Sequence, residues 1–385
     1  FAKKFFKKQI YETDYGKNIA YNYLIERGFD KKIIDDFEIG CLTNKRDSFK
    51  NYAVDNGYNL DDLVSLGLIS SKNKNDIYSS RIIFPIKTIS GRTVGFGARV
   101  LQNSVKSAKY INSPDSVIYK KSKILYGLYN SKNQIVKNDN CYIVEGYTDV
   151  IRFHQKGIHN VVSSSGTALT NGQINIIRRL TKNITMLFDS DNAGLNATIR
   201  SVDMILSEGM NVSVCLFPKN EDPDSYAKHK STVEIQEYLD QNSIDFIEFK
   251  AKKLNDSKRN SAVEKAQVVN DIVSSISKIP DKIKQEIYIK QCSQMLDITE
   301  NTLFNSLAQL NQIVRFNKKN YDEEKTISIK KESTDQIFKL EKKIIEILIL
   351  YGNENVTFDE IKMMKDKSGE ISYNPIKVKS SVHEK

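Results

Sequence analysis

The chain has 385 residues, 39% of them hydrophobic, which is enough for roughly two or three domains with ordinary cores. No apolar run reaches the ~20 residues of a membrane-spanning helix, and the four cysteines and four histidines are too scattered for a structural zinc site. This composition predicts a cytoplasmic protein without a membrane contact, and its net charge of +10 lies almost entirely in residues 1–130.

The first 130 residues predict a mixed α+β subdomain. The stretch YNYLIERGFDKKIIDDFEIG has the periodicity of two short helices separated at Gly28. The stretch RIIFPIKTISGRTVGFGARVL reads as two strands joined by a turn at Ser90–Gly91. Gly95 and Gly97 weaken the second strand, which indicates a bulge or the close approach of another backbone.

Basic residues are densest between Arg81 and Lys123. This stretch holds nine basic residues and a single acid, and tyrosines are interleaved with them. A solvated face is the simplest origin of a charge run, but this density with aromatic residues favours nucleic acid as a partner.

Strands and helices alternate from about residue 139, as in CYIVEG, NVVSSSG, NITMLFDSD and NVSVCLF with a helix between each pair. Such alternation predicts a small parallel sheet with right-handed crossovers. Beyond Ser225 the sequence predicts helices only, then a charged linker, then a further helix and a tail without a pattern from about 367 to 385. The fold class is therefore α/β, a small parallel sheet between a basic α+β subdomain and a helical one, with predicted boundaries at 1–130, 131–226, 227–315, 316–334 and 335–385.

Acidic residues follow the carboxyl ends of three predicted strands, where open α/β sheets bind their ligands. Each alone has a structural explanation, because an acid after a strand often caps a helix or forms a turn. Together they form a cluster of hard oxygen donors that suits Mg²⁺ or Mn²⁺ and a phosphoryl-type transfer. The set is Glu145, Asp149, Asp189, Asp191, Asp222 and Asp224.

The stretch DSDNAG also resembles two other motifs, but neighbouring residues do not fit either of them. A calcium-binding EF-hand loop needs a ligand at the position of Ala193 and a glutamate at the position of Arg200. A haloacid-dehalogenase phosphatase resembles the chain less well, because Ala193 again stands where that family usually has Thr or Val.

The ordered series IVEGYTDVI, LFDSD and NEDPDSY resembles a Toprim domain, and the preceding blocks RIIFPI, GRTVGFGARVL and KYINSPDSVIYKKSKILYGL narrow the likeness to the catalytic core of bacterial DnaG-type primases. The resemblance covers about residues 1–315. It implies synthesis of short RNA primers on single-stranded DNA from ribonucleoside triphosphates, with Mg²⁺ or Mn²⁺ held by the six acids and Glu145, Asp189 and Asp191 at the reaction centre. It also implies that template and nucleotide contacts come from Arg81, Arg99, Lys109, Tyr110 and Asn112.

The family also has parts that this chain lacks or shortens. Its zinc-binding domain, the place where Zn²⁺ is expected, is absent here, and we expect it to precede Phe1. The segment 335–385 resembles the start of the domain that binds the replicative helicase, and we expect the core to be monomeric. Another Toprim enzyme, such as a topoisomerase fragment or nuclease, and a non-catalytic DNA-binding scaffold remain as alternatives.

Overall fold

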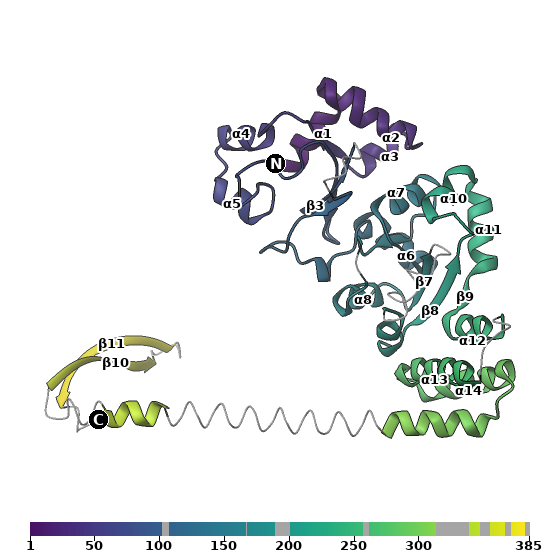
Figure 1. Cartoon of the computed structure of the whole chain (residues 1–385). Helices are drawn as coiled ribbons and strands as arrows, with labels where there is room; N and C mark the ends of the chain where they lie inside the picture. Colours follow the sequence, from purple (N-terminus) through teal and green to yellow (C-terminus); the bar gives the residue numbers. More distant parts are fainter. Residues whose placement is uncertain are drawn as a thin grey trace. The chain divides into compact units, whose positions relative to one another are not determined.

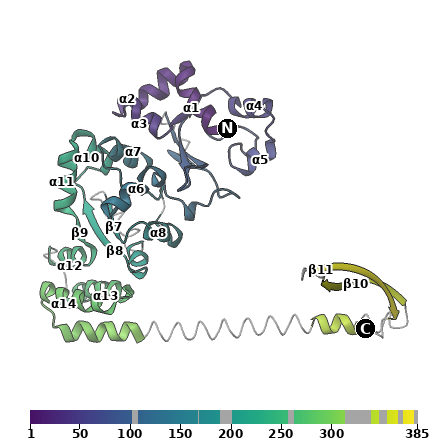
Figure 2. The same ribbon diagram turned by 180° about the vertical axis from the view of Figure 1, so that it is seen from behind.

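The computed structural model describes residues 1–101, 108–166, 168–188, 201–256, 262–312, 339–346, 355–365 and 371–381. The chain forms two compact units, Phe1–Ala308 and Gln309–Lys385. The first unit contains both of the larger sheets and the helices that cover them (Figures 1 and 2).

The N-terminal part is built on a four-stranded antiparallel sheet in the order β1-β2-β3-β4. Its strands are β1 Gly40–Leu42, β2 Arg81–Lys87, β3 Thr93–Val100 and β4 Tyr110–Asn112. Around it lie helices α1 Ala2–Glu12, η1 Gly16–Tyr21, α2 Asn22–Glu26, α3 Lys31–Asp36, α4 Ser48–Asp55 and α5 Leu60–Ser65.

The local predictions for this part are confirmed. Strands β2 and β3 pair as the predicted hairpin, with a register irregularity beside Ile86. Helices α2 and α3 are separated at Gly28, whose φ of +85° is a left-handed conformation that glycine adopts without strain.

The second sheet has the order β6-β5-β7-β8-β9. Strands β5 Cys141–Val144, β6 Val161–Ser163, β7 Asn183–Phe188 and β8 Asn211–Leu216 pair in parallel, which confirms the predicted α/β class. The helices that belong to it are η2 Lys121–Lys123, α6 Leu128–Asn138, α7 Tyr147–Gln155, α8 Asn171–Arg178, residues 201–207, α10 Pro223–His229 and α11 Thr232–Asn242. Helix α6 spans the boundary predicted between residues 130 and 131.

Two strand regions were not predicted. The expectation that strands end at Ser225 is wrong, because β9 Ile244–Asp245 adds an antiparallel edge to β8. Strands β10 Asn355–Lys365 and β11 Ile371–Ser381 pair as a hairpin, so the tail from 367 includes a strand. Two residues are too few to show a period of two, and the Pro375 in β11 argues against a strand.

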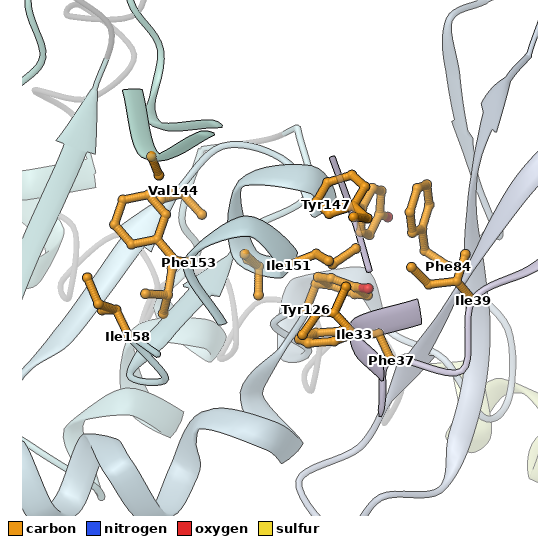
Figure 3. Packing of buried hydrophobic residues seen from close by; sticks show 14 of the residues in the cluster. Ile33, Phe37, Ile39, Phe84, Tyr126, Val144, Tyr147, Ile151, Phe153 and Ile158 are labelled. Carbon is orange, nitrogen blue, oxygen red and sulfur yellow. The ribbon is translucent and has the colours of Figure 1, made fainter. Parts of the chain in front are cut away.

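One hydrophobic core runs through both parts of the first unit. Ile33, Phe37 and Phe84 from the N-terminal part meet Ile151 and Phe153 of α7 in a single cluster (Figure 3). Such continuous burial favours one cooperative unit over two independently moving subdomains.

After β9, the elements among the described residues up to 312 are helices. Helices α12 Phe246–Asp256, α13 Ala262–Lys278 and α14 Lys282–Leu296 pack on one another, and residues 300–312 form a further helix (Figure 1). In the second unit, residues 339–346 are helical. None of the helices that the structure describes has the length and apolar character to cross a bilayer.

We predict that His154 makes the stability of the fold depend on pH. The side chain is buried in the core with Nε2 3.0 Å from the Ser131 hydroxyl, and burial, helped by His159, lowers its pKa to about 3. Between about pH 6.5 and pH 3 the unfolded chain binds a proton that the folded chain does not, so the free energy of unfolding falls as pH falls, by up to about 1.4 kcal/mol per pH unit.

Urea unfolding at several pH values measures this effect. A His154→Gln variant should lose the part of the slope that this histidine contributes, while the variant of its exposed neighbour, His159→Gln, should keep most of that part, because burial is the main cause. An unchanged slope in His154→Gln would contradict the assignment.

Candidate active site

A pocket of about 380 Å³ lies between the N-terminal sheet and the carboxyl edge of the parallel sheet. Its acidic wall consists of Glu145, Asp149, Asp222 and Asp224, all predicted from the sequence. Its opposite wall contains Arg99, Lys109, Tyr110 and Asn112, which were also predicted. Eight of the predicted site residues therefore line one cavity.

Glu145 and Asp149 are placed by the junction of β5 and α7. Glu145 directly follows β5, and its carbonyl oxygen accepts a hydrogen bond from the Ser163 hydroxyl at 2.6 Å. Asp149 lies in the first turn of α7, where its Oδ2 accepts from the backbone N–H of Gly146 at 2.8 Å. This bond satisfies one of the free N–H groups at the helix start and fixes the carboxylate beside Glu145.

Asp222 is the N-cap of α10. Its Oδ1 accepts from the backbone N–H of Ser225 at 2.6 Å, and the Ser225 hydroxyl accepts from the N–H of Asp222 at 2.9 Å. Pro223 occupies the first helical position, where its missing N–H costs nothing. The sequence left open that Asp222 and Asp224 belong only to a turn; Asp222 instead caps a helix, and it lines the pocket as well.

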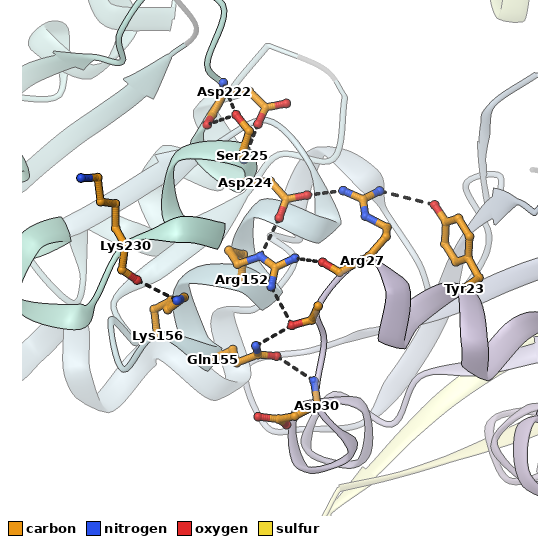
Figure 4. Close-up of polar contacts among 11 residues, drawn as sticks. Tyr23, Arg27, Asp30, Arg152, Gln155, Lys156, Asp222, Asp224, Ser225 and Lys230 are labelled. Atoms are coloured by element: carbon orange, nitrogen blue, oxygen red, sulfur yellow. Dashed lines mark hydrogen bonds and ion pairs between the residues drawn. The ribbon is translucent and has the colours of Figure 1, made fainter.

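Asp224 differs from its neighbours because arginines contact both of its oxygens (Figure 4). Arg152 Nε donates to Oδ1 at 2.8 Å, and Arg27 Nη2 donates to Oδ2. Although burial opposes it, this carboxylate gives the Arg27 guanidinium a raised pKa.

Arg152 is almost completely buried, with 1% of its surface exposed. Besides its bond to Asp224, it donates to the carbonyl oxygen of Gly28 at 2.9 Å and to that of Arg27, and its guanidinium lies 4.2 Å from the centre of the Phe29 ring. These contacts hold the turn after α2 against α7 and α10.

The D-x-D pair, Asp189 and Asp191, lies outside the described residues. The structure does describe β7 up to Phe188, and it places this strand beside β5. The carboxyl ends of β5 and β7 are therefore neighbours at the sheet edge, as the sequence predicts.

On the basic wall, the Arg99 guanidinium lies over two aromatic rings, 5.3 Å from the centre of Tyr23 and 5.6 Å from that of Tyr110. Its Nη1 is buried without a hydrogen-bond acceptor among the residues that the structure describes. Burial raises the pKa of the Tyr110 hydroxyl to about 12, so this ring stays neutral at physiological pH. The wall combines positive charge with aromatic rings, as nucleotide-binding surfaces do.

Arg81 does not line this pocket. Its side chain is buried, and Nη1 donates to the carbonyl oxygen of Ala108 at 2.9 Å. It thereby supports the backbone that leads into β4 and positions Lys109 indirectly.

Arg27 is a pocket residue that the sequence prediction missed. The sequence places it at the end of a short helix, where a cation is common and carries no functional signal. Only its pairing with Asp224, which lies 197 residues further along the chain, distinguishes it.

Tyr147 joins the two walls. Its hydroxyl donates to Asn112 Oδ1 at 2.5 Å, and its ring stacks on Phe84 at 5.1 Å and meets Tyr126 edge-on at 4.6 Å (Figure 3). Gly97 lies directly against this ring and has no room for a Cβ atom. The neighbour at Gly97 is thus a side chain and not the other backbone that was predicted, whereas the irregular register where Ile86 pairs with Gly95 matches the predicted bulge.

Carboxylate oxygens are the donors that Mg²⁺ and Mn²⁺ prefer, so the acidic wall is chemically suited to these ions. Within the part of the chain that the structure describes, no three acidic, histidine or cysteine side chains are grouped closely enough to hold a metal alone. The described acids thus form only part of a possible metal site.

Three family models match the chain. They are described as DNA primase catalytic core, N-terminal domain, over residues 5–132; Toprim-like, over residues 142–227; and DnaB-helicase binding domain of primase, over residues 254–301. The last match covers α13 and α14 in the predicted helical subdomain and does not include the segment 335–385.

The chain is 34% identical to a DNA primase of Clostridium acetobutylicum over 75% of its own length, and 32% identical to one of Halalkalibacterium halodurans over 79%. It spans 48% and 51% of these relatives, about half their length. A solved DNA primase domain from Pseudomonas aeruginosa matches with a TM-score of 0.71 at 28% identity, covering 80% of this chain and 97% of that one. A DnaG primase catalytic domain solved bound to single-stranded DNA matches with a TM-score of 0.70 at 26% identity, covering 78% and 95%.

The contact between Gly97 and Tyr147 gives a test of the geometry at the pocket. Gly97→Ala should lower the free energy of unfolding by roughly 1–3 kcal/mol, because the new methyl group overlaps the Tyr147 ring in a packed core. Gly95→Ala on the same strand is the control and should cost less, since its Cβ would lie 3.2 Å from the Ser113 side chain. Urea unfolding measures both, and a Gly97 variant as stable as wild type would contradict the close packing.

Proposed function

The chain belongs to the family of the DnaG-type DNA primase catalytic core, and we propose that it synthesises short RNA primers on single-stranded DNA from ribonucleoside triphosphates during DNA replication. The observation that carries this proposal is the pocket, in which acids at the edge of the Toprim-like sheet face basic and aromatic residues of the N-terminal sheet. A nucleotidyl transfer needs both, because the triphosphate and the template are polyanions and the reaction develops further negative charge.

We propose that the acidic wall holds Mg²⁺ or Mn²⁺ through Glu145, Asp149 and Asp222, with Asp189 and Asp191 following β7. Bound there, such an ion supplies positive charge for the phosphates and lowers the pKa of the attacking primer hydroxyl. Glu145, Asp189 and Asp191 are the proposed catalytic residues. Asp224 belongs to the predicted metal set as well, although an arginine contacts each of its oxygens.

We propose that Arg99, Lys109, Tyr110 and Asn112 contact the template or the incoming nucleotide, and that Arg81 acts through the position of Lys109. A relative was solved bound to single-stranded DNA, which supports this assignment. The helicase is a proposed partner through residues 254–301, whose match bears its name, and through the predicted segment 335–385. We also propose that the core is monomeric and that the protein is located in the cytoplasm.

A primer-synthesis assay tests the activity. The chain is incubated with single-stranded DNA, labelled ribonucleoside triphosphates and Mg²⁺ or Mn²⁺. Short RNA products should form, and Glu145→Ala or Asp189→Ala should reduce them by at least ~10²-fold, because each removes a proposed catalytic carboxylate. Nicking or relaxation of DNA without RNA products would instead identify another Toprim enzyme, and DNA binding without any reaction would favour the scaffold alternative.

The basic wall is tested by binding. Arg99→Ala and Lys109→Ala should each weaken binding of single-stranded DNA or nucleotide while the fold survives, and each lost phosphate contact should reduce the salt dependence of log K by about 0.7. Lys8→Ala is the matched control, since this exposed lysine of α1 pairs with Glu12 and does not line the pocket. Fluorescence anisotropy at several salt concentrations measures the difference, and equal binding by all three variants would remove the assignment.

A further inference from the structure

The acids of the pocket differ in what holds them. Asp149 and Asp222 each accept a backbone N–H at a helix start. Asp224 is instead 6% exposed and has a guanidinium on each carboxylate oxygen. The Pro223 between Asp222 and Asp224 therefore separates two acids in different environments.

The arginines at Asp224 come from two distant parts of the chain. Arg27 follows α2 in the N-terminal part, and Arg152 lies on α7 of the parallel sheet (Figure 4). Asp224 itself is in the first turn of α10, so a single carboxylate joins three elements.

Arg152 connects Asp224 to the backbone of the turn that follows α2. Its Nε holds Asp224, while its two terminal nitrogens hold the carbonyl oxygens of Arg27 and Gly28. The planar guanidinium thus fixes the backbone of Arg27, and Asp224 fixes its side chain. Both restraints are needed because α2 ends at Glu26 and the turn that follows has a left-handed glycine.

A metal ion bound by Asp224 would meet a carboxylate whose two oxygens each already accept from a guanidinium, and both cations would repel it. Releasing Arg152 to relieve this repulsion would leave a buried guanidinium without its carboxylate, and keeping Arg27 in place would leave a second cation beside the ion. Glu145, Asp149 and Asp222 line the same pocket.

We infer that Asp224 is a positioning residue and not a metal ligand: with Arg152 it clamps the turn at Arg27–Gly28 and sets the Arg27 guanidinium in the wall of the pocket. The inference deepens the proposed function and rests on it for the role of the pocket. The clamp itself is independent of the reaction.

The test uses four variants. They are Asp224→Asn, Arg152→Met, the double variant that carries both of these changes, and Asp222→Asn alone. Asp224→Asn and Arg152→Met should each lower Tm by roughly 10 °C in the absence of divalent metal, and the double variant should lose much less than the sum, because the two residues act as one pair. Asp222→Asn is the matched control and should keep its Tm, since Asn caps a helix as well as Asp does.

Mn²⁺ binding, measured by calorimetry below the unfolding temperature, separates the two roles. Asp224→Asn should bind Mn²⁺ within about twofold of wild type, whereas Asp222→Asn should bind at least ~10-fold more weakly. A Tm that stays constant or rises in Asp224→Asn, together with a loss of Mn²⁺ affinity as large as in Asp222→Asn, would overturn the inference. Wild-type protein that binds no Mn²⁺ would overturn the proposed metal site, and the Tm values would then decide on the clamp alone.

Arg152→Lys distinguishes positioning from simple stability. Lysine keeps the charge for Asp224 but cannot reach both carbonyl oxygens in a fork. The Tm of Arg152→Lys should lie about halfway between those of Arg152→Met and the wild type. Relative to the wild type, its KM for ribonucleoside triphosphates should stay raised severalfold, and its kcat should change by less than about twofold. Recovery of KM in step with Tm would mean that the pair is only structural and would overturn the positioning role.

Discussion

The buried ion pair between Arg152 and Asp224 is the interaction on which the arrangement of the first unit depends. Removing a guanidinium and a carboxylate from water costs several kcal/mol for each ion, and the structure offsets this cost with a second arginine and two backbone carbonyl oxygens. Such a site tolerates one geometry only, because a displaced partner leaves a charge without compensation. The pair therefore determines how α2, α7 and α10 meet, and with them the two walls of the pocket.

The pocket is shared between two sheets, and this follows from the packing. Tyr147 follows β5 by three residues, yet its ring lies among residues of the N-terminal sheet and its hydroxyl reaches Asn112 of β4. The core of Figure 3 is continuous across the same boundary. Acidic and basic walls consequently keep their separation as long as the unit is folded, so neither wall is expected to form without the other.

The sequence was a good guide wherever a pattern is local. Two β-rich runs that flank the turn at Ser90–Gly91 identified the β2–β3 hairpin, and alternating strands and helices placed Glu145 and Asp222 at one sheet edge. It could not reveal that Arg27 and Arg152 meet at Asp224, since partners 197 and 72 residues apart leave no periodic signal. For the same reason it placed Arg81 in the pocket, although that side chain supports the backbone behind it. The strand β9 was not predicted because it has only two residues. The hairpin β10–β11 was not predicted because a proline in β11 argues against a strand.

The hydrogen bonds that Asp149 and Asp222 accept from backbone N–H groups at helix starts have a consequence for affinity. Each side chain is held in one rotamer by a backbone N–H before any ligand arrives. A carboxylate that is free to rotate loses roughly 0.5–1.5 kcal/mol of entropy when it is immobilised by a ligand, and two restrained carboxylates avoid most of that loss. Both helix starts form when the chain folds, so the orientation of these oxygens is fixed in the folded state. A weakly held ion can therefore exchange rapidly, because the pocket does not have to rearrange around each new ion.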